Sequence, residues 1–195
     1  MNRRIAFVPL ACVGLVALGA AQLFAAITVS STNVPLAIPD ASSVNSTLAV
    51  VPSGTITDAN LTVNISHLWD ADIQISLAGP TVAAQLLWKN CGSSGDNLTN
   101  TVIDNDAAGL AVCTSVGGPP FTGSFQPTDG GSNAGTTPVP AAGSLNAFDG
   151  TDSAGTWTLS VADDSSLITG TLNAWSITLD GAPPLPVELM NFEIG

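Results

Sequence analysis

The fold class of this chain is decided by GTWTLSVADDSSLITGTLNAWSITL, residues 155–179. Apolar residues alternate with small polar residues from Trp157 to Val161, and again from Trp175 to Leu179. A period of two over two consecutive segments is typical of half-buried antiparallel strands, and the acidic residues between them predict a turn. The stretch therefore predicts an all-β sandwich in which each sheet has one face in the core and one face in water.

Three more segments extend this prediction toward the N-terminus. Alternation is clear in 56–68 and in 72–77, and a third strand is expected in 82–88, after a Gly-Pro turn at 79–80. Residues 27–51 predict an irregular entry with an extended pair, because serine, proline and asparagine are dense there. The core of the domain is therefore expected to come from alternating strands along most of the chain.

Periodicity fades between residues 90 and 143, where glycine, serine, aspartate, asparagine and proline dominate. This composition predicts a long loop region, within which 122–125 could form a short strand. A loop of this length in a compact domain usually carries a function.

The N-terminal 26 residues have the order of a secretory signal peptide. Arg3 and Arg4 precede an apolar run that is followed by small residues, and the run is short for a membrane span. The alternative is an uncleaved N-terminal anchor. We expect a signal peptide at 1–26, a sandwich domain at 27–182, and a C-terminal tail or truncated linker at 183–195.

Charge limits the partners of the exported chain. Without Arg3 and Arg4, Lys89 is the only lysine or arginine left against fifteen acidic residues. Such a surface repels phosphate backbones and anionic headgroups, which disfavours nucleic acid and, after signal cleavage, membrane insertion. We expect a monomer, secreted or at the cell surface of a bacterium, with cations as natural partners.

The cysteines predict one disulfide. Cys12 leaves with the signal peptide, so Cys91 and Cys113 remain as an even pair in an oxidising compartment. A bond between them would close a loop of about twenty residues and contribute on the order of 3 kcal/mol. The alternative is a pair of free buried thiols.

Four motifs in this order resemble the P domain, also called the Homo B domain, of proprotein convertases and bacterial subtilisin-like proteases. They are HLWDADIQISLAGP (67–80), CGSSGDNLTNTVIDNDA (91–107), PPFTGSFQP (119–127), and LNAFDGTDSAGTWTLSVADD (145–164) leading into GTLNAWSITL (170–179). Gly79 stands where the family commonly has serine before the proline. The resemblance implies a jelly-roll-like, galactose-binding-domain-like sandwich. It also implies a non-catalytic module that stabilises or regulates a serine protease domain.

Nothing in the chain resembles the catalytic segments of a subtilisin-like protease. A nucleophilic triad would have to use the single histidine, His67, and there is no Gly-x-Ser-x-Gly elbow. The conceivable partners are Ser66, Ser93, Ser94, Asp70 and Asp72. The favoured interpretation is a structural histidine at a strand end, bonded to a carboxylate or to the backbone. We therefore expect no enzyme activity.

Acidic loops make calcium the expected cofactor, because calcium takes carboxylate, carbonyl and amide oxygens. The candidate ligands are Asp72, Asp96, Asp104 and Asp106, where the resemblance implies that Asp72 lies near the other three. A second, weaker group is Asp149, Asp152, Asp163 and Asp164. The alternative for both groups is that the aspartates form turns and provide solubility. Zinc is disfavoured because only one histidine and two paired cysteines are available.

The sequence leaves two classes of function open. The first is a calcium-stabilised accessory module, with a protease domain or another exported protein as its partner. The second is a cell-surface adhesion or carbohydrate-binding sandwich. Trp157 and Trp175 lie on inward faces of alternating strands and are expected in the core, whereas Trp69 lies in a turn and stays open as a sugar contact. An exposed aromatic row would favour the second class, and an apolar docking patch would favour the first.

Overall fold

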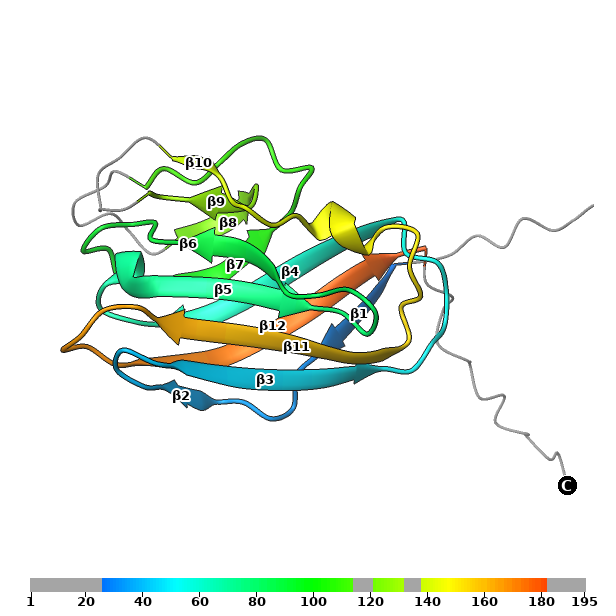
Figure 1. The fold of residues 1–195 in the computed structure, drawn as a ribbon, viewed down its shortest axis with the longest axis horizontal. Helices are drawn as coiled ribbons and strands as arrows, with labels where there is room; N and C mark the ends of the chain where they lie inside the picture. Colours follow the sequence, from blue (N-terminus) through cyan, green and yellow to red (C-terminus); the bar gives the residue numbers. More distant parts are fainter. Residues whose placement is uncertain (1–25, 114–120, 132–137, 182–195) are drawn as a thin grey trace, which may run out of the picture.

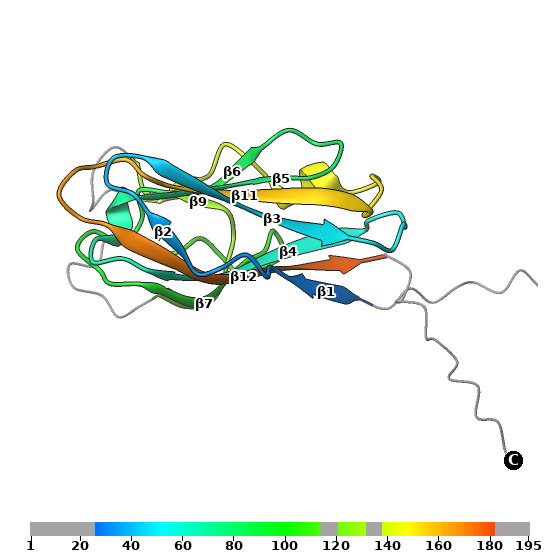
Figure 2. The same cartoon turned by 90° about the horizontal axis from the view of Figure 1, so that it is seen from below.

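A computed structural model describes residues 26–113, 121–131 and 138–181, and over these residues the chain forms two six-stranded sheets packed face to face. Figure 2 shows the two layers edge-on, with the core between them. The all-β sandwich predicted from the alternation is confirmed. The predicted signal peptide, apart from residue 26, and the predicted tail at 183–195 lie outside the described residues.

The first sheet has the strand order β1-β12-β4-β7-β8, and β2 pairs with the start of β12. Its strands are β1 (Ile27–Ser30), β2 (Leu36–Ile38), β4 (Asp58–Ser66), β7 (Leu98–Ile103), β8 (Phe121–Phe125) and β12 (Gly170–Asp180). Pairing is antiparallel except between β7 and β8.

The second sheet has the order β10-β9-β6-β5-β11-β3, and only β6 and β9 pair in parallel. Its strands are β3 (Ser43–Val50), β5 (Ile73–Ala78), β6 (Gln85–Lys89), β9 (Thr128–Asp129), β10 (Val139–Pro140) and β11 (Gly155–Asp163). Two short 3-10 helices complete the fold, η1 (Asp70–Asp72) and η2 (Leu145–Phe148). In the described part of the chain, neither these nor any other helix is long and apolar enough to cross a bilayer.

The two strands of the deciding segment, β11 and β12, lie in opposite sheets and do not pair with each other (Figure 1). Their inward residues are buried as predicted, and Trp157 and Trp175 are both in the core. A register shift between Leu172 and Ala174 adds a residue to β12. Leu172 and Trp175 therefore both face inward although they are three positions apart.

The predicted strands in 56–68 and 72–77 correspond to β4 and β5, and β6 overlaps the predicted 82–88 and extends one residue beyond it. Burial along β4 and β5 alternates without interruption, as expected for strands with one face in the core. The connection between them crosses from the first sheet to the second. The predicted irregular entry at 27–51 contains three strands, β1, β2 and β3, instead of one extended pair.

The prediction of one long loop over 90–143 is wrong. The segment contains β7, β8, β9 and β10, of which only the strand at 122–125 was expected. Asn100 explains why β7 escaped notice, because its backbone has a φ of 48° and the register of β7 against both neighbours shifts around it. Leu98, Thr101 and Ile103 face inward at spacings of three and two, so the period-two signal is lost.

Candidate functional site

The candidate site is the end of the sandwich where β4 leads through the turn at 67–72 into β5. The η1 helix and the β11–β12 connection both lie at this end of the molecule (Figures 1 and 2). We call it the His67 end. The loop at 91–97 also reaches it, because the backbone N–H of Asn97 donates to the carbonyl of His67 at 3.0 Å.

His67 is 2% exposed, and both of its ring nitrogens have partners. Nε2 lies 3.2 Å from Oδ2 of Asp163 at the end of β11, and Nδ1 lies 2.8 Å from the carbonyl oxygen of Trp69. The histidine thus connects the two sheets. The sequence interpretation of a structural histidine bonded to a carboxylate and to the backbone is confirmed.

Gly170 gives the imidazole its room. A Cβ atom at this position would lie 2.6 Å from Cδ2 of His67 and 2.8 Å from the carbonyl oxygen of Ser66. Any larger residue at the start of β12 would therefore displace the histidine or the end of β4.

Asp70 is fully buried in η1, and neither carboxylate oxygen has a hydrogen-bond partner within the described residues. Burial raises the pKa of Asp70 to about 8, the nearby N–H of Asn97, which donates to the carbonyl of His67, opposes the shift, and the negative charge of Asp96 adds to it. An unpaired buried carboxylate is costly in free energy, so this group must take a proton or another positive charge.

Asp72 lies at the same end but faces a different set of groups. Burial raises its pKa, and the charge of Asp163 adds to this shift; His67 opposes it and Asp164 adds to it. Asp164 accepts a hydrogen bond from Nε2 of Gln74 at 2.6 Å. Asp72 therefore belongs to the surroundings of the His67–Asp163 pair.

The four aspartates of the first calcium prediction are not brought together. Asp96 precedes β7 at the His67 end, whereas Asp104 and Asp106 follow β7 at the opposite end of the sandwich. The register of β4 on β7 fixes this arrangement, since Ile65 pairs with Leu98 and Leu61 with Ile103. A six-residue strand separates its two ends by roughly 20 Å.

The second predicted group also divides. Burial raises the pKa of Asp149, and the charges of Asp58 and Asp106 at the far end of the sandwich add to the shift. Asp152 accepts N–H bonds from Ala154 and Gly54, and Asp163 and Asp164 lie at the His67 end. Throughout the ranges that the structure describes, no three histidine, cysteine, aspartate or glutamate side chains lie close enough to hold a metal. Calcium binding by either predicted set stays a prediction.

Asp152 behaves as a turn former, which was the alternative interpretation of its group. The N–H of Ala154 lowers its pKa most, and the hydroxyl of Ser53 and the N–H of Gly54 lower it further. Its oxygens are thereby occupied by local hydrogen bonds.

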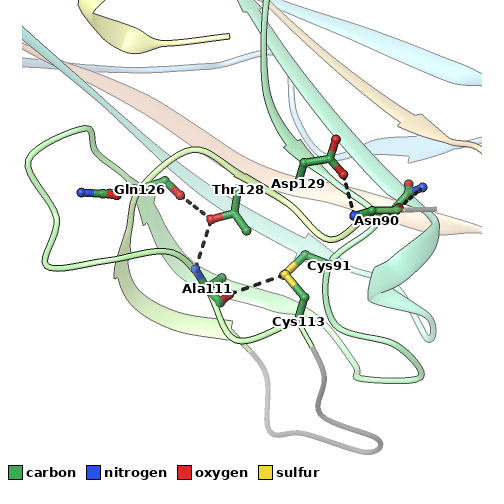
Figure 3. Close-up of a disulfide and its surroundings, with 8 residues drawn as sticks. Asn90, Cys91, Ala111, Cys113, Gln126, Thr128 and Asp129 are labelled. Atoms are coloured by element: carbon green, nitrogen blue, oxygen red, sulfur yellow. Dashed lines mark hydrogen bonds between the residues drawn. A yellow bond between two sulfur atoms is a disulfide. The ribbon is translucent and has the colours of Figure 1, made fainter. Parts of the chain in front are cut away.

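The predicted disulfide between Cys91 and Cys113 is present, and both residues are buried (Figure 3). The hydroxyl of Thr128 accepts from the N–H of Ala111 at 3.1 Å and donates to the carbonyl of Gln126 at 2.6 Å. The disulfide fixes the start of the 91–97 loop beside β9. The loop that approaches Asp70 is therefore held at its N-terminal end by a covalent bond.

Exposed apolar side chains are also found at the His67 end. Leu68 is 64% exposed, Trp69 is 40% exposed, and Leu167 in the β11–β12 connection is 92% exposed with a backbone φ of 90°. A leucine in the left-handed region is strained. The other three tryptophans, Trp88, Trp157 and Trp175, are buried.

Sequence reasoning missed the most unusual group at this end. The sequence indicates Asp70 only as a conceivable partner of a catalytic histidine, and the structure gives that partnership to Asp163. The available signal was the run Leu68-Trp69-Asp70-Ala71, where an acid stands among apolar residues just before a buried strand.

The geometry defines the protein as a β-sandwich whose single histidine has a structural role. Its buried carboxylate, unpartnered within the described residues, and the exposed apolar side chains of Leu68, Trp69 and Leu167 lie at the same end, the His67 end. Residues 127–179 match the family model of the proprotein convertase P-domain, which confirms the resemblance over this part of the chain. The sequence comparison with curated proteins found no match.

Two solved structures resemble the fold. They are a serine protease of Aeromonas sobria, at 15% identity and a TM-score of 0.46, and that protease in complex with the chaperone ORF2, at 17% identity and a TM-score of 0.45. The alignments cover 81% and 82% of this chain but only 27% of each of those chains.

Proposed function

We propose that this chain is an exported, calcium-stabilised accessory module without catalytic residues of its own, which binds and stabilises a subtilisin-like serine endopeptidase. The observation that carries the proposal is the match of residues 127–179 to the proprotein convertase P-domain. That region contains β11 and most of β12, the strands that supply a large part of the core.

The surroundings of His67 support a non-catalytic role. A general base needs a ring nitrogen free to reach a nucleophile and a substrate. Here one nitrogen faces Asp163 and the other faces Trp69, and the side chain is buried.

Export is supported by the N-terminal sequence and by the disulfide between two buried cysteines. Disulfides persist in oxidising compartments and are rare in the cytosol. Outside the cell calcium is plentiful, and the excess of acidic over basic residues makes a cation the natural stabilising ligand.

The apolar residues at the His67 end support binding to another protein. Leu68, Trp69 and Leu167 are exposed there, and the acids nearby are largely buried or hydrogen-bonded. The exposed large apolar side chains of the described chain include one aromatic residue, Trp69, so no aromatic row for sugar stacking is seen in that part. This favours the accessory module over the carbohydrate-binding alternative.

The test is the thermal inactivation of a subtilisin-like endopeptidase from which its own P domain has been removed, with and without the purified chain. The proposal predicts a complex on size-exclusion chromatography and a longer inactivation half-life. Replacing Trp69 by Ala together with Leu167 by Ser should weaken both effects. Val51→Ser is the matched control, because Val51 is 81% exposed and follows β3 at the opposite end.

A wild-type chain that neither binds nor protects any of several such endopeptidases would contradict the proposal. Binding to a panel of polysaccharides, lost in Trp69→Ala, would establish the carbohydrate-binding alternative instead.

A further inference from the structure

The feature that the proposed function leaves unexplained is the carboxylate of Asp70. The residue is 0% exposed, and neither Oδ1 nor Oδ2 has a hydrogen-bond partner within the described residues. The backbone N–H of Asp70, in contrast, has a partner, because it donates to the carbonyl of Gly95 at 2.9 Å. Buried carboxylates in folded proteins are normally paired or coordinate a metal.

The loop at 91–97 is packed directly against this carboxylate. The N–H of Ala71 donates to the carbonyl of Ser93 at 3.2 Å, which adds a second bond between η1 and the loop. A Cβ atom at Gly92 would lie 2.8 Å from Cβ of Asp70, so the close approach requires glycine. Gly92 also has a φ of 116°, which glycine adopts without strain.

A second carboxylate belongs to the same loop, because Asp96 directly follows Gly95, whose carbonyl accepts the N–H of Asp70. Asp96 is exposed, and its negative charge acts on Asp70. The two groups differ in burial: one is reachable from solvent, and the other is closed off by the loop. A cation bound between them would neutralise both charges and complete the coordination of the buried oxygens.

We propose that Asp70 and Asp96, together with main-chain carbonyls of the 91–97 loop, form a binding site for a calcium ion. The site deepens the calcium part of the proposed function and does not depend on association with a protease. Of the four ligands predicted from the sequence, this site keeps only Asp96. Asp70 takes the place of Asp72, Asp104 and Asp106.

The donor set selects a hard cation. The nearby nitrogen and sulfur ligands are already occupied, because His67 is bonded to Asp163 and Trp69, and Cys91 is in the disulfide. Carboxylate and carbonyl oxygens suit calcium and magnesium. An irregular loop favours calcium, which accepts variable geometry, over magnesium, which requires a near-ideal octahedron.

The test is calorimetric titration of the full, oxidised chain with calcium chloride, repeated with magnesium chloride and combined with thermal unfolding. We expect saturable calcium binding at one site and a rise in the unfolding midpoint that magnesium does not reproduce. Asp70→Asn should weaken calcium affinity by roughly 100-fold, and Asp96→Asn by roughly tenfold. Without calcium at neutral pH, Asp70→Asn should be at least as stable as the wild type, because the buried amide, unlike the carboxyl group, does not have to take up a proton when the chain folds.

Two matched variants make the result specific. Asp40→Asn removes an exposed aspartate that follows β2, and Asp104→Asn removes one of the predicted ligands at the far end of β7; both variants should bind calcium like the wild type. Absence of calcium binding by the wild type would overturn the site, as would binding that survives in Asp70→Asn. Should calcium bind while the endopeptidase is not protected, the association with a protease fails and the site stands.

Discussion

The two ends of β7 carry the same kind of residue in different surroundings. At the His67 end, the carboxylate of Asp70 is enclosed without a hydrogen-bond partner among the described residues, and Asp163 is paired with the histidine. At the other end, Asp104 accepts a bond from the N–H of Asp106 at 2.7 Å and lies within reach of the charge of Asp58. The comparison shows that counting acids along a loop does not locate a cation site. What distinguishes Asp70 from Asp104 is its burial and the absence of partners for its carboxylate oxygens among the described residues.

Among the substitutions that test this comparison, the one at His67 is expected to have the largest effect on the free energy of unfolding. His67→Ala should lower the free energy of unfolding by about 3–5 kcal/mol, because it leaves Oδ2 of Asp163 buried without its partner, while only Oδ1 keeps a hydrogen bond, from the N–H of Ser165. Urea unfolding followed by tryptophan fluorescence measures the loss. A loss below about 1 kcal/mol would show that the pair is a solvated surface contact.

Gly170→Ala provides an independent check on the same pair. The added methyl group displaces the imidazole or the end of β4, so the variant should also be destabilised. When it is combined with His67→Ala, the total loss should be smaller than the sum of the two, since the ring is absent and only the contact with the carbonyl oxygen of Ser66 and its surroundings remains.

The next largest effect on stability is expected from the disulfide that holds the start of the 91–97 loop. Replacing Cys91 and Cys113 together by alanine should lower the free energy of unfolding by about 3 kcal/mol. The wild type measured in reductant should fall to the same value. A reduced wild type that unfolds at an unchanged urea concentration would mean that the bond contributes no stability.

A smaller effect, visible through its pH dependence, is expected from Asp70. Because its pKa is raised when the protein is folded, the folded chain holds a proton between about pH 4 and pH 8 that the unfolded chain has released. The stability contributed by this group is therefore complete below about pH 4 and is lost as pH rises toward 8. Asp70→Asn, measured without calcium, should gain stability relative to the wild type across this range. A constant difference between the two proteins would contradict the raised pKa.

The smallest effect is expected at the opposite end of β7. Asp104→Asn retains the Oδ1 acceptor for the N–H of Asp106, so the free energy of unfolding should change by no more than about 0.5 kcal/mol. A change larger than that of Asp70→Asn at neutral pH would reverse the comparison between the two ends.

How far the sequence predicts the molecule depends on where strict alternation holds. β4, β5 and β11 bury every second residue, and they were found from the sequence. β7 was missed because the left-handed backbone at Asn100 breaks the period. That β11 and β12 lie in opposite sheets could not be predicted, since alternation defines the inward face of a strand but not its neighbours.

The site shows the same limit. The role of His67 and the disulfide were predictable, because a lone histidine at a strand end and an even pair of cysteines each have few alternatives. The burial of Asp70 was not predictable, because it depends on a 3-10 turn and on a loop that is distant in sequence. No local pattern of period two or 3.6 reports a contact of that kind.

The most direct test of the central claim is the titration of the Asp70 carboxyl carbon by NMR between pH 4 and pH 9 in calcium-free buffer. The account predicts a midpoint near 8 for Asp70, removed by calcium, which keeps the carboxylate charged at lower pH. A midpoint near 4 that calcium does not change would contradict it, because the carboxylate would then be solvated or already paired.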